Sequence, residues 1–219
     1  MNSFNKAILF DMDGVVLDSE KLYTKAEIKL FREYGVEIPE EDWDLFRGCS
    51  ENEFFNKSMK RYNIKEDKAL FMKKGRGYVK REFEDNLSYM PGFKELHSTI
   101  IKNYKTALVT ASPKHNLSWV RTIIDLDYYF ENILSGEETN KNKPHPDPYL
   151  EMMARLNVKP ANTIIIEDSL NGIHAGLKSG AYVIAKTGSV PTNRLSIAHK
   201  IVSNLNEITK SLIEELLQK

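Results

Sequence analysis

The chain has 219 residues, of which 41% are hydrophobic and 28% are charged, so it can bury a core as one large domain or as one domain with an insertion. Lys plus Arg and Asp plus Glu number 31 each, and this balance supplies no global field that would attract nucleic acid or an anionic membrane. The single cysteine, Cys49, cannot form an internal disulfide. The apolar stretch near the amino terminus is short and ends in acidic residues, which fits neither a signal peptide nor a membrane-spanning helix. We therefore expect a cytoplasmic protein that binds neither nucleic acid nor membrane.

Short runs of aliphatic and β-branched residues predict the strands of a parallel sheet, because a strand covered on both faces is apolar without alternation. Helical patterns of the length that a crossover connection requires separate these runs. The predicted strands are residues 7–10, 106–109, 132–134, 163–166, 182–185 and, as a sixth candidate, 200–202. The predicted core helices are residues 93–103, 114–124, 148–156 and 170–179. This alternation predicts an α/β fold with a doubly wound, mainly parallel, Rossmann-like sheet.

The segment after the first predicted strand interrupts this alternation, because it contains helical patterns and no convincing strand. The first pattern carries an apolar stripe at three-to-four spacing that must pack on a partner. The predicted helices of this segment are residues 20–34, 40–46, 51–61 and 66–83. We predict that residues 17–87 form an inserted α-helical cap domain, and that residues 1–16 and 88–219 form the α/β catalytic core.

Acidic residues follow two of the predicted strands, at the sheet edge where open parallel sheets bind ligands. Asp11 and Asp13 follow the first strand, and their two-residue spacing in extended chain places both side chains on the same side. Gly14 then permits a sharp turn beside a ligand. Glu167 and Asp168 follow the fourth strand. The sequence therefore predicts four carboxylates on one rim of the sheet.

The same rim carries residues that suit an anion. Thr110 and Ala111 end the second strand and offer a hydroxyl and backbone N–H groups near a helix start, and Lys143 follows the third strand. Clustered carboxylates raise one another's pKa or hold a hard cation, and oxygen ligands without a nearby His or Cys set favour Mg²⁺ over zinc. Because a phosphoryl group needs several donors at once, we infer a phosphoryl-transfer site.

These residues, in this order, resemble the motifs of the haloacid dehalogenase-like phosphohydrolase superfamily, in its subgroup with a helical cap inserted after the first strand. The chain looks most similar to the β-phosphoglucomutase-like phosphatases, and the resemblance covers essentially its whole length. The Asp-Met-Asp-Gly-Val sequence at 11–15, Thr110, Lys143 and the Glu167-Asp168 pair match the four family motifs. Each motif alone is a common loop sequence, whereas their conjunction at successive strand ends is specific.

The resemblance implies a role for each residue of the rim. It makes Asp11 the nucleophile that forms an aspartyl-phosphate, and Asp13 the general acid and base. Thr110, Ala111 and Lys143 would hold the transferring phosphoryl group. The ligands implied for Mg²⁺ are Asp11, the backbone carbonyl of Asp13, Asp168 and, through water, Glu167.

The cap of this subgroup selects the substrate, so we consider Arg47, Glu51 and Lys74 as candidates for contacting the leaving group. β-Phosphoglucomutases would carry an Arg near position 51 and a His near position 23, whereas this chain has Glu51 and Tyr23. We therefore expect a monomeric phosphatase whose partner is a small phosphorylated metabolite, either a sugar phosphate or a nucleotide-type compound.

Two alternative functions remain open. A phosphosugar mutase of the β-phosphoglucomutase type would pass the phosphoryl group to a sugar hydroxyl instead of water. A phosphoryl-receiver module, which is not an enzyme, also uses carboxylates, Mg²⁺, a hydroxyl residue and a lysine on a doubly wound sheet. A receiver needs neither a cap nor a proton donor such as Asp13, so the sequence disfavours it.

Overall fold

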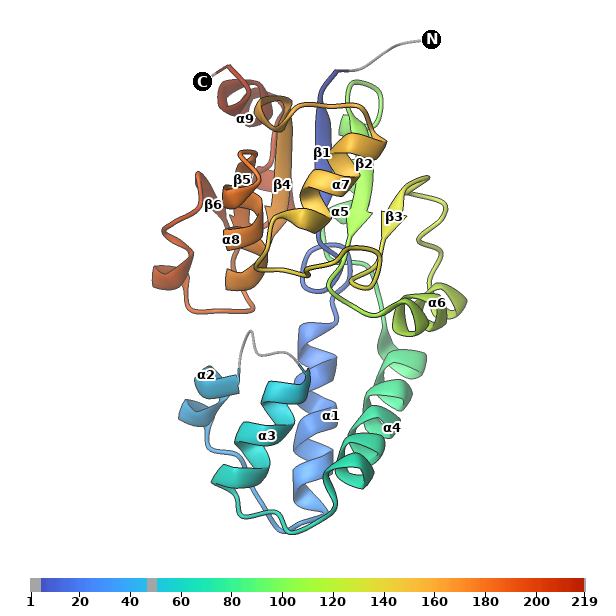
Figure 1. The fold of residues 1–219 in the computed structure, drawn as a ribbon, viewed down its shortest axis with the longest axis vertical. Coiled ribbons are helices and arrows are strands. Elements are labelled where there is room, and N and C mark those ends of the chain that lie inside the picture. Colours follow the sequence, from blue (N-terminus) through green and yellow to red (C-terminus); the bar gives the residue numbers. More distant parts are fainter. Residues whose placement is uncertain (1–4, 47–50, 219) are drawn as a thin grey trace. The chain divides into compact units, whose positions relative to one another are not determined.

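The computed structural model describes residues 5–46 and 51–218 (Figure 1). The chain divides into two compact units, one formed by Met1–Asp18 and Tyr89–Lys219 and the other by Ser19–Ser88. Across the described ranges, no helix combines the length and the apolar character that crossing a membrane requires.

The larger unit is built on a six-stranded sheet in which every strand pairing is parallel. The strands are β1 (Ala7–Phe10), β2 (Lys105–Val109), β3 (Ile133–Leu134), β4 (Thr163–Glu167), β5 (Tyr182–Lys186) and β6 (Lys200–Val202). They lie in the order β3-β2-β1-β4-β5-β6, with β1 and β4 at the centre (Figure 1). The predicted α/β, doubly wound fold class is confirmed.

Helices cover both faces of this sheet, which explains why β1 and β4 are buried along their whole length. The core helices are α5 (Phe93–Ile100), α6 (Lys114–Ile123), α7 (Asp147–Arg155), α8 (Leu170–Lys178) and α9 (Lys210–Leu216). On one face, Leu9 and Ile165 belong to an apolar cluster with Met152 of α7 and Ile173 of α8. On the other, the Phe10 ring meets Phe93 of α5 at 5.8 Å between centroids.

Helix bounds in the sheet unit differ from the predicted ones mainly at carboxyl ends. The helix predicted over 93–103 ends at Ile100, because Asn103 N–H and Tyr104 N–H both donate to the Ile100 carbonyl and turn the chain into β2. The short helix α9 was absent from the predicted elements. Single 3₁₀ turns lie at Pro160–Asn162, Thr192–Leu195 and Leu205–Glu207.

The smaller unit consists of helices that an aromatic cluster holds together. These are α1 (Glu20–Arg32), a 3₁₀ turn at Glu40–Asp42, α2 (Trp43–Phe46), α3 (Glu51–Arg61) and α4 (Lys68–Asn86). The Phe31 ring of α1 packs edge-on against Phe71 of α4 at 5.4 Å and against Phe54 of α3 at 6.2 Å between centroids. Aromatic side chains supply large buried area, so this cluster is the core of the unit.

Candidate active site

The carboxyl ends of β1 and β4 bring the predicted acidic residues together. Phe10 pairs with Ile166, and the Asp11 N–H donates to the Ile166 carbonyl at 3.0 Å. Asp11 therefore lies beside Glu167 and Asp168 one residue beyond the strand pairing. All three acids are buried, with Asp11 8% exposed and Glu167 fully buried.

Lys143 lies at the centre of this acidic group. Its Nζ donates to Asp11 Oδ1 at 2.5 Å, to Glu167 Oε1 at 2.7 Å and to the Val109 carbonyl at 2.9 Å. The side chain is only 3% exposed, so all three N–H groups of the ammonium are used inside the protein. A buried cation with two carboxylate partners is held rigidly in position.

Glu167 is fixed by hydrogen bonds at both oxygens. Its Oε1 accepts from Lys143 and from the Tyr149 hydroxyl, each at 2.7 Å. Its Oε2 accepts from the Asp168 N–H at 3.1 Å, and from the N–H and hydroxyl of Ser169 at 3.2 and 3.0 Å. Gly172 is required behind it, since a Cβ there would lie 1.7 Å from Glu167 Oε1.

The charges of this group shift one another's pKa values in opposite directions. Burial, followed by the neighbouring Glu167 carboxylate, raises the pKa of Asp11 to about 8. Burial alone would lower the pKa of Lys143, but the Asp11 and Glu167 carboxylates raise it above its ordinary value. Burial would raise the pKa of Glu167, but Lys143 lowers it. The site thus carries more acid than its one lysine neutralises, which is a setting that a further cation would stabilise.

Asp11, Glu167 and Asp168 form the one group of metal-ligating side chains found among the described residues, with a candidate ligand atom from each within 4.8 Å of the others. The Ser189 hydroxyl, from the loop after β5, donates to Asp168 Oδ2. The donors are all oxygen atoms, which suits Mg²⁺ better than zinc. Gly14 has φ +70°, and its lack of a side chain allows the backbone to approach Asp168.

The loop after β2 supplies the hydroxyl and backbone groups predicted for phosphate. Thr110 continues the sheet, because its N–H donates to the Leu134 carbonyl at 2.9 Å, and its Oγ1 accepts from the Ser112 N–H at 3.0 Å. Ser112 Oγ lies 3.5 Å from Asp13 Oδ2, so this loop and the β1 loop meet. The Ala111 carbonyl accepts from the Asn142 side chain at 3.0 Å, directly before Lys143.

Of the candidate residues of the helical unit, Glu51 and Lys74 have partners within that unit, whereas Arg47 lies outside the described residues. Glu51 accepts two hydrogen bonds from Arg76, from Nε at 2.8 Å and from Nη2 at 2.7 Å. Lys74 donates to the Tyr34 hydroxyl at 2.8 Å and to Glu66 Oε2 at 3.3 Å. Glu51 of α3 is thus paired with Arg76 of α4, whereas the partners of Lys74 lie in the turn after α1 and the loop before α4.

Sequence reasoning did not single out Tyr149 and Ser189, which contact the acidic group directly. Ser189 follows a predicted strand. The expectation that ligands bind beyond the carboxyl ends of parallel strands, which identified Asp168, could therefore have identified Ser189 as well. Tyr149 lies on the buried face of α7, where its pattern looks like any core aromatic residue. No signal in the sequence distinguishes it.

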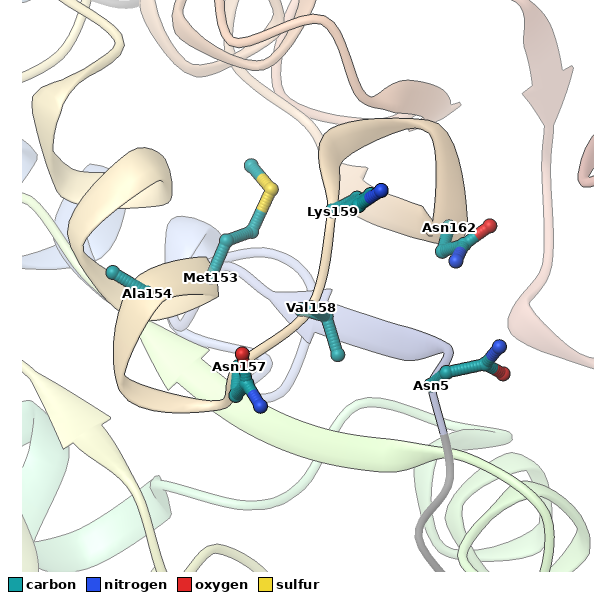
Figure 2. Close-up of a pocket in the computed structure, with 7 residues that line it drawn as sticks. All are labelled: Asn5, Met153, Ala154, Asn157, Val158, Lys159 and Asn162. Carbon is teal, nitrogen blue, oxygen red and sulfur yellow. The ribbon is translucent and has the colours of Figure 1, made fainter.

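A separate pocket lies at the opposite end of the strands from the acidic group. It has a volume of about 330 Å³ and begins where Asn5 enters β1 (Figure 2). Three asparagines and Lys159 line it together with Met153 and Ala154 of α7 and Val158 after that helix, as the sticks in Figure 2 show. It has no carboxylate and lies apart from the residues described above.

The comparisons with known proteins agree with this geometry. The family model described as haloacid dehalogenase-like hydrolase matches residues 8–186. A phosphorylated carbohydrates phosphatase of Thermotoga maritima is 33% identical over 176 residues, covering 80% of this chain and 82% of that protein. Hexitol phosphatase B of Escherichia coli is 28% identical over 218 residues, covering 93% and 94%. A solved β-phosphoglucomutase from Clostridium difficile superposes with a TM-score of 0.77 at 25% identity, covering 97% of each chain.

Proposed function

The chain belongs to the haloacid dehalogenase-like hydrolase family and is a phosphoric monoester hydrolase, and on that premise we propose that it is a Mg²⁺-dependent phosphatase of small phosphorylated carbohydrates. The reaction would proceed through an aspartyl-phosphate on Asp11. The observation that carries the proposal is the buried contact of Asp11 with Lys143 beside Glu167 and Asp168, at the carboxyl ends of β1 and β4.

Asp11 and Asp13 would divide the chemistry between them. Asp11 Oδ attacks phosphorus and forms an acyl phosphate, while the bond from phosphorus to the substrate oxygen breaks and Asp13 gives that oxygen a proton. Asp13 then removes a proton from water, whose oxygen attacks the phosphorus of the acyl phosphate. This second step releases inorganic phosphate and restores Asp11. The same two carboxyl groups therefore return to their starting states after one turnover.

Lys143, Thr110 and Ala111 would bind the phosphoryl oxygens. Two anions repel each other, so a carboxylate can attack a phosphate only where positive charge and hydrogen-bond donors offset the repulsion. Lys143 Nζ already lies 2.5 Å from Asp11 Oδ1, which supports a position beside the phosphorus. The Thr110 hydroxyl and the Ala111 N–H come from the adjacent loop after β2.

Asp11, Asp168 and the Asp13 carbonyl would hold Mg²⁺, with Glu167 acting through water. The donor set fits the ion, because the three carboxylates are buried, offer only oxygen and exceed the charge of Lys143. When bound, Mg²⁺ would neutralise negative charge on the transferring phosphoryl group. Glu167 itself orients Lys143, since both of its oxygens accept hydrogen bonds within the protein.

We further propose that residues 17–87 act as a cap that selects the leaving group. The two curated relatives act on phosphorylated carbohydrates and hexitol phosphate by name, which supports a polyhydroxylated leaving group here. Arg47, Glu51 and Lys74 remain candidates for contacting it. Because Arg76 engages Glu51 through two hydrogen bonds, any role of Glu51 includes that arginine.

A phosphosugar mutase is the second candidate function, favoured by the structural likeness to a β-phosphoglucomutase. Against it, position 51 holds Glu instead of the expected Arg, and this glutamate pairs with Arg76. A mutase would isomerise a hexose 1-phosphate, whereas the proposed phosphatase would release phosphate from it.

The test is phosphate release from a panel of sugar phosphates, polyol phosphates and nucleoside monophosphates, with Mg²⁺ and with excess EDTA. We expect Mg²⁺-dependent release that ranks sugar or polyol phosphates first, and none from Asp11→Asn. Isomerisation of a hexose 1-phosphate without net release would establish the mutase. Stable labelling of Asp11 by a small phosphodonor, with no release from any monoester, would contradict both.

A further inference from the structure

Tyr149 contacts the acidic group directly, and the proposed chemistry gives it no role. It lies on α7, six residues after Lys143, and is the largest fully buried side chain among the described residues. It reaches no solvent, so it cannot touch a substrate from its present position. Its hydroxyl and the face of its ring instead contact two charged residues beside Asp11, Glu167 and Lys143.

Tyr149 touches Glu167 with its hydroxyl and Lys143 with its ring. The hydroxyl donates to Glu167 Oε1 at 2.7 Å, the same oxygen that accepts from Lys143 Nζ. The centre of the ring lies 4.9 Å from Lys143 Nζ, within the range of a cation–π interaction. One side chain therefore fixes both partners of a buried ion pair.

This double contact matters because lysine is a flexible side chain. A four-carbon chain leaves the ammonium many positions, and the carboxylate that attracts it can itself rotate. Glu167 Oε2 is anchored by backbone and serine donors, so the Tyr149 hydroxyl completes the restraint at Oε1. With both ends of the carboxylate held, Lys143 Nζ has one position, against Asp11 Oδ1.

We propose that Tyr149 is a positioning residue, which acts through Glu167 and its own ring to hold Lys143 Nζ against Asp11 for phosphoryl transfer. The proposal rests on the function proposed above for Asp11 and Lys143. It assigns Tyr149 no proton transfer and no contact with substrate. Its effect should appear in the rate of the chemical step and not in substrate binding.

The test compares Tyr149→Phe with the wild-type enzyme in steady-state kinetics on the best substrate of the panel. Phe fills the same space and keeps the ring face, so only the hydrogen bond to a charged oxygen is lost. We expect kcat to fall by about tenfold or more, the usual effect of such a bond, with KM within about twofold of wild type. Wild-type kcat, or a rise in KM alone, would overturn the proposal.

Tyr104→Phe is the matched control. Tyr104 is a buried tyrosine, 5% exposed, that precedes β2 at the other end of the strand, and its hydroxyl makes no hydrogen bond to the described residues. It should leave kcat unchanged. In a Glu167→Gln background, Tyr149→Phe should cost little further activity, because the two residues act in series. If Tyr149→Phe lowers kcat by the same factor in the Glu167→Gln background as in the wild type, Tyr149 does not act through Glu167.

A readout without substrate separates this inference from the proposed function. The side-chain ammonium signal of Lys143 in ¹H–¹⁵N NMR spectra, assigned by its absence in Lys143→Met, should shift and broaden in Tyr149→Phe and stay unchanged in Tyr104→Phe. If the wild type releases no phosphate from any monoester, the proposed function fails and this signal alone decides whether Tyr149 holds Lys143. An unmoved signal would overturn the inference.

Discussion

Gly14 and Asp168 approach so closely that a Cβ on Gly14 would lie 1.7 Å from Asp168 Oδ2 and 2.9 Å from Ser189 Oγ. The turn after β1 therefore runs directly against the carboxylate proposed to hold the metal. Gly14 also has φ +70°, a backbone conformation that costs other residues about 1–2 kcal/mol. Both the positive φ and the lack of room for a Cβ beside Asp168 require glycine at this position.

Gly14→Ala should abolish activity, because the methyl group must displace Asp168 or distort the turn that carries Asp13. Gly35→Ala is the matched control, since Gly35 has φ +69° and no atom within 4 Å of its Cβ position among the described residues. It should lose about 1 kcal/mol of stability and keep wild-type kcat. Urea unfolding of both variants measures the cost of the positive φ that the two positions share. Steady-state kinetics measures the effect of the contact with Asp168, which only Gly14→Ala creates. Wild-type activity in Gly14→Ala would contradict the assignment of Asp168.

Asp11→Asn should stop turnover and stabilise the metal-free protein. Because the folded pKa of Asp11 is raised from 3.8 to about 8, the folded protein keeps a proton over this range that the unfolded chain loses. Its stability therefore falls as pH rises between these two values, and Asn removes this loss. Urea unfolding in EDTA should show the gain growing from pH 5 to pH 8. If Asp11→Asn is more stable than the wild type by the same amount at every pH in that range, the pKa of Asp11 is not raised.

The fold was predictable because each strand is a short apolar run bounded by polar loops, and a parallel sheet then follows from the crossover helices. Neighbouring strand ends explain why Asp11 and Glu167, far apart in the chain, both contact Lys143. The positions of helix ends were less predictable, since tertiary hydrogen bonds such as those to the Ile100 carbonyl decide them. Tyr149 was unpredictable for a different reason, because an apolar helix face looks the same whether its hydroxyl meets a site residue or not.

Mg²⁺ should raise the thermal stability of the wild type, and EDTA should reverse the gain. A ligand at a hundredfold excess over its Kd stabilises the folded state by about 2.7 kcal/mol. Asp168→Asn should lose this gain, whereas Ser189→Ala, which removes only the hydroxyl that donates to Asp168, should weaken it. Differential scanning fluorimetry over a Mg²⁺ titration measures all three proteins. An equal Mg²⁺ response in Asp168→Asn would place the ion elsewhere.

His97 should make the protein less stable as pH falls, independently of the acidic group. It is 4% exposed on α5, with Nε2 2.9 Å from the Tyr129 carbonyl, and burial lowers its pKa below the ordinary value of 6.5. The unfolded chain therefore takes up a proton at a higher pH than the folded protein, and stability is lost as pH falls below 6.5. His97→Gln keeps a donor for Tyr129 but cannot titrate, so its unfolding free energy should change less between pH 7 and pH 5 than that of the wild type.

His115→Gln, at an exposed position on α6, is the control, and its unfolding free energy should change with pH as that of the wild type does. If urea unfolding gives the wild type and His97→Gln the same dependence of unfolding free energy on pH, groups other than His97 cause the acid sensitivity.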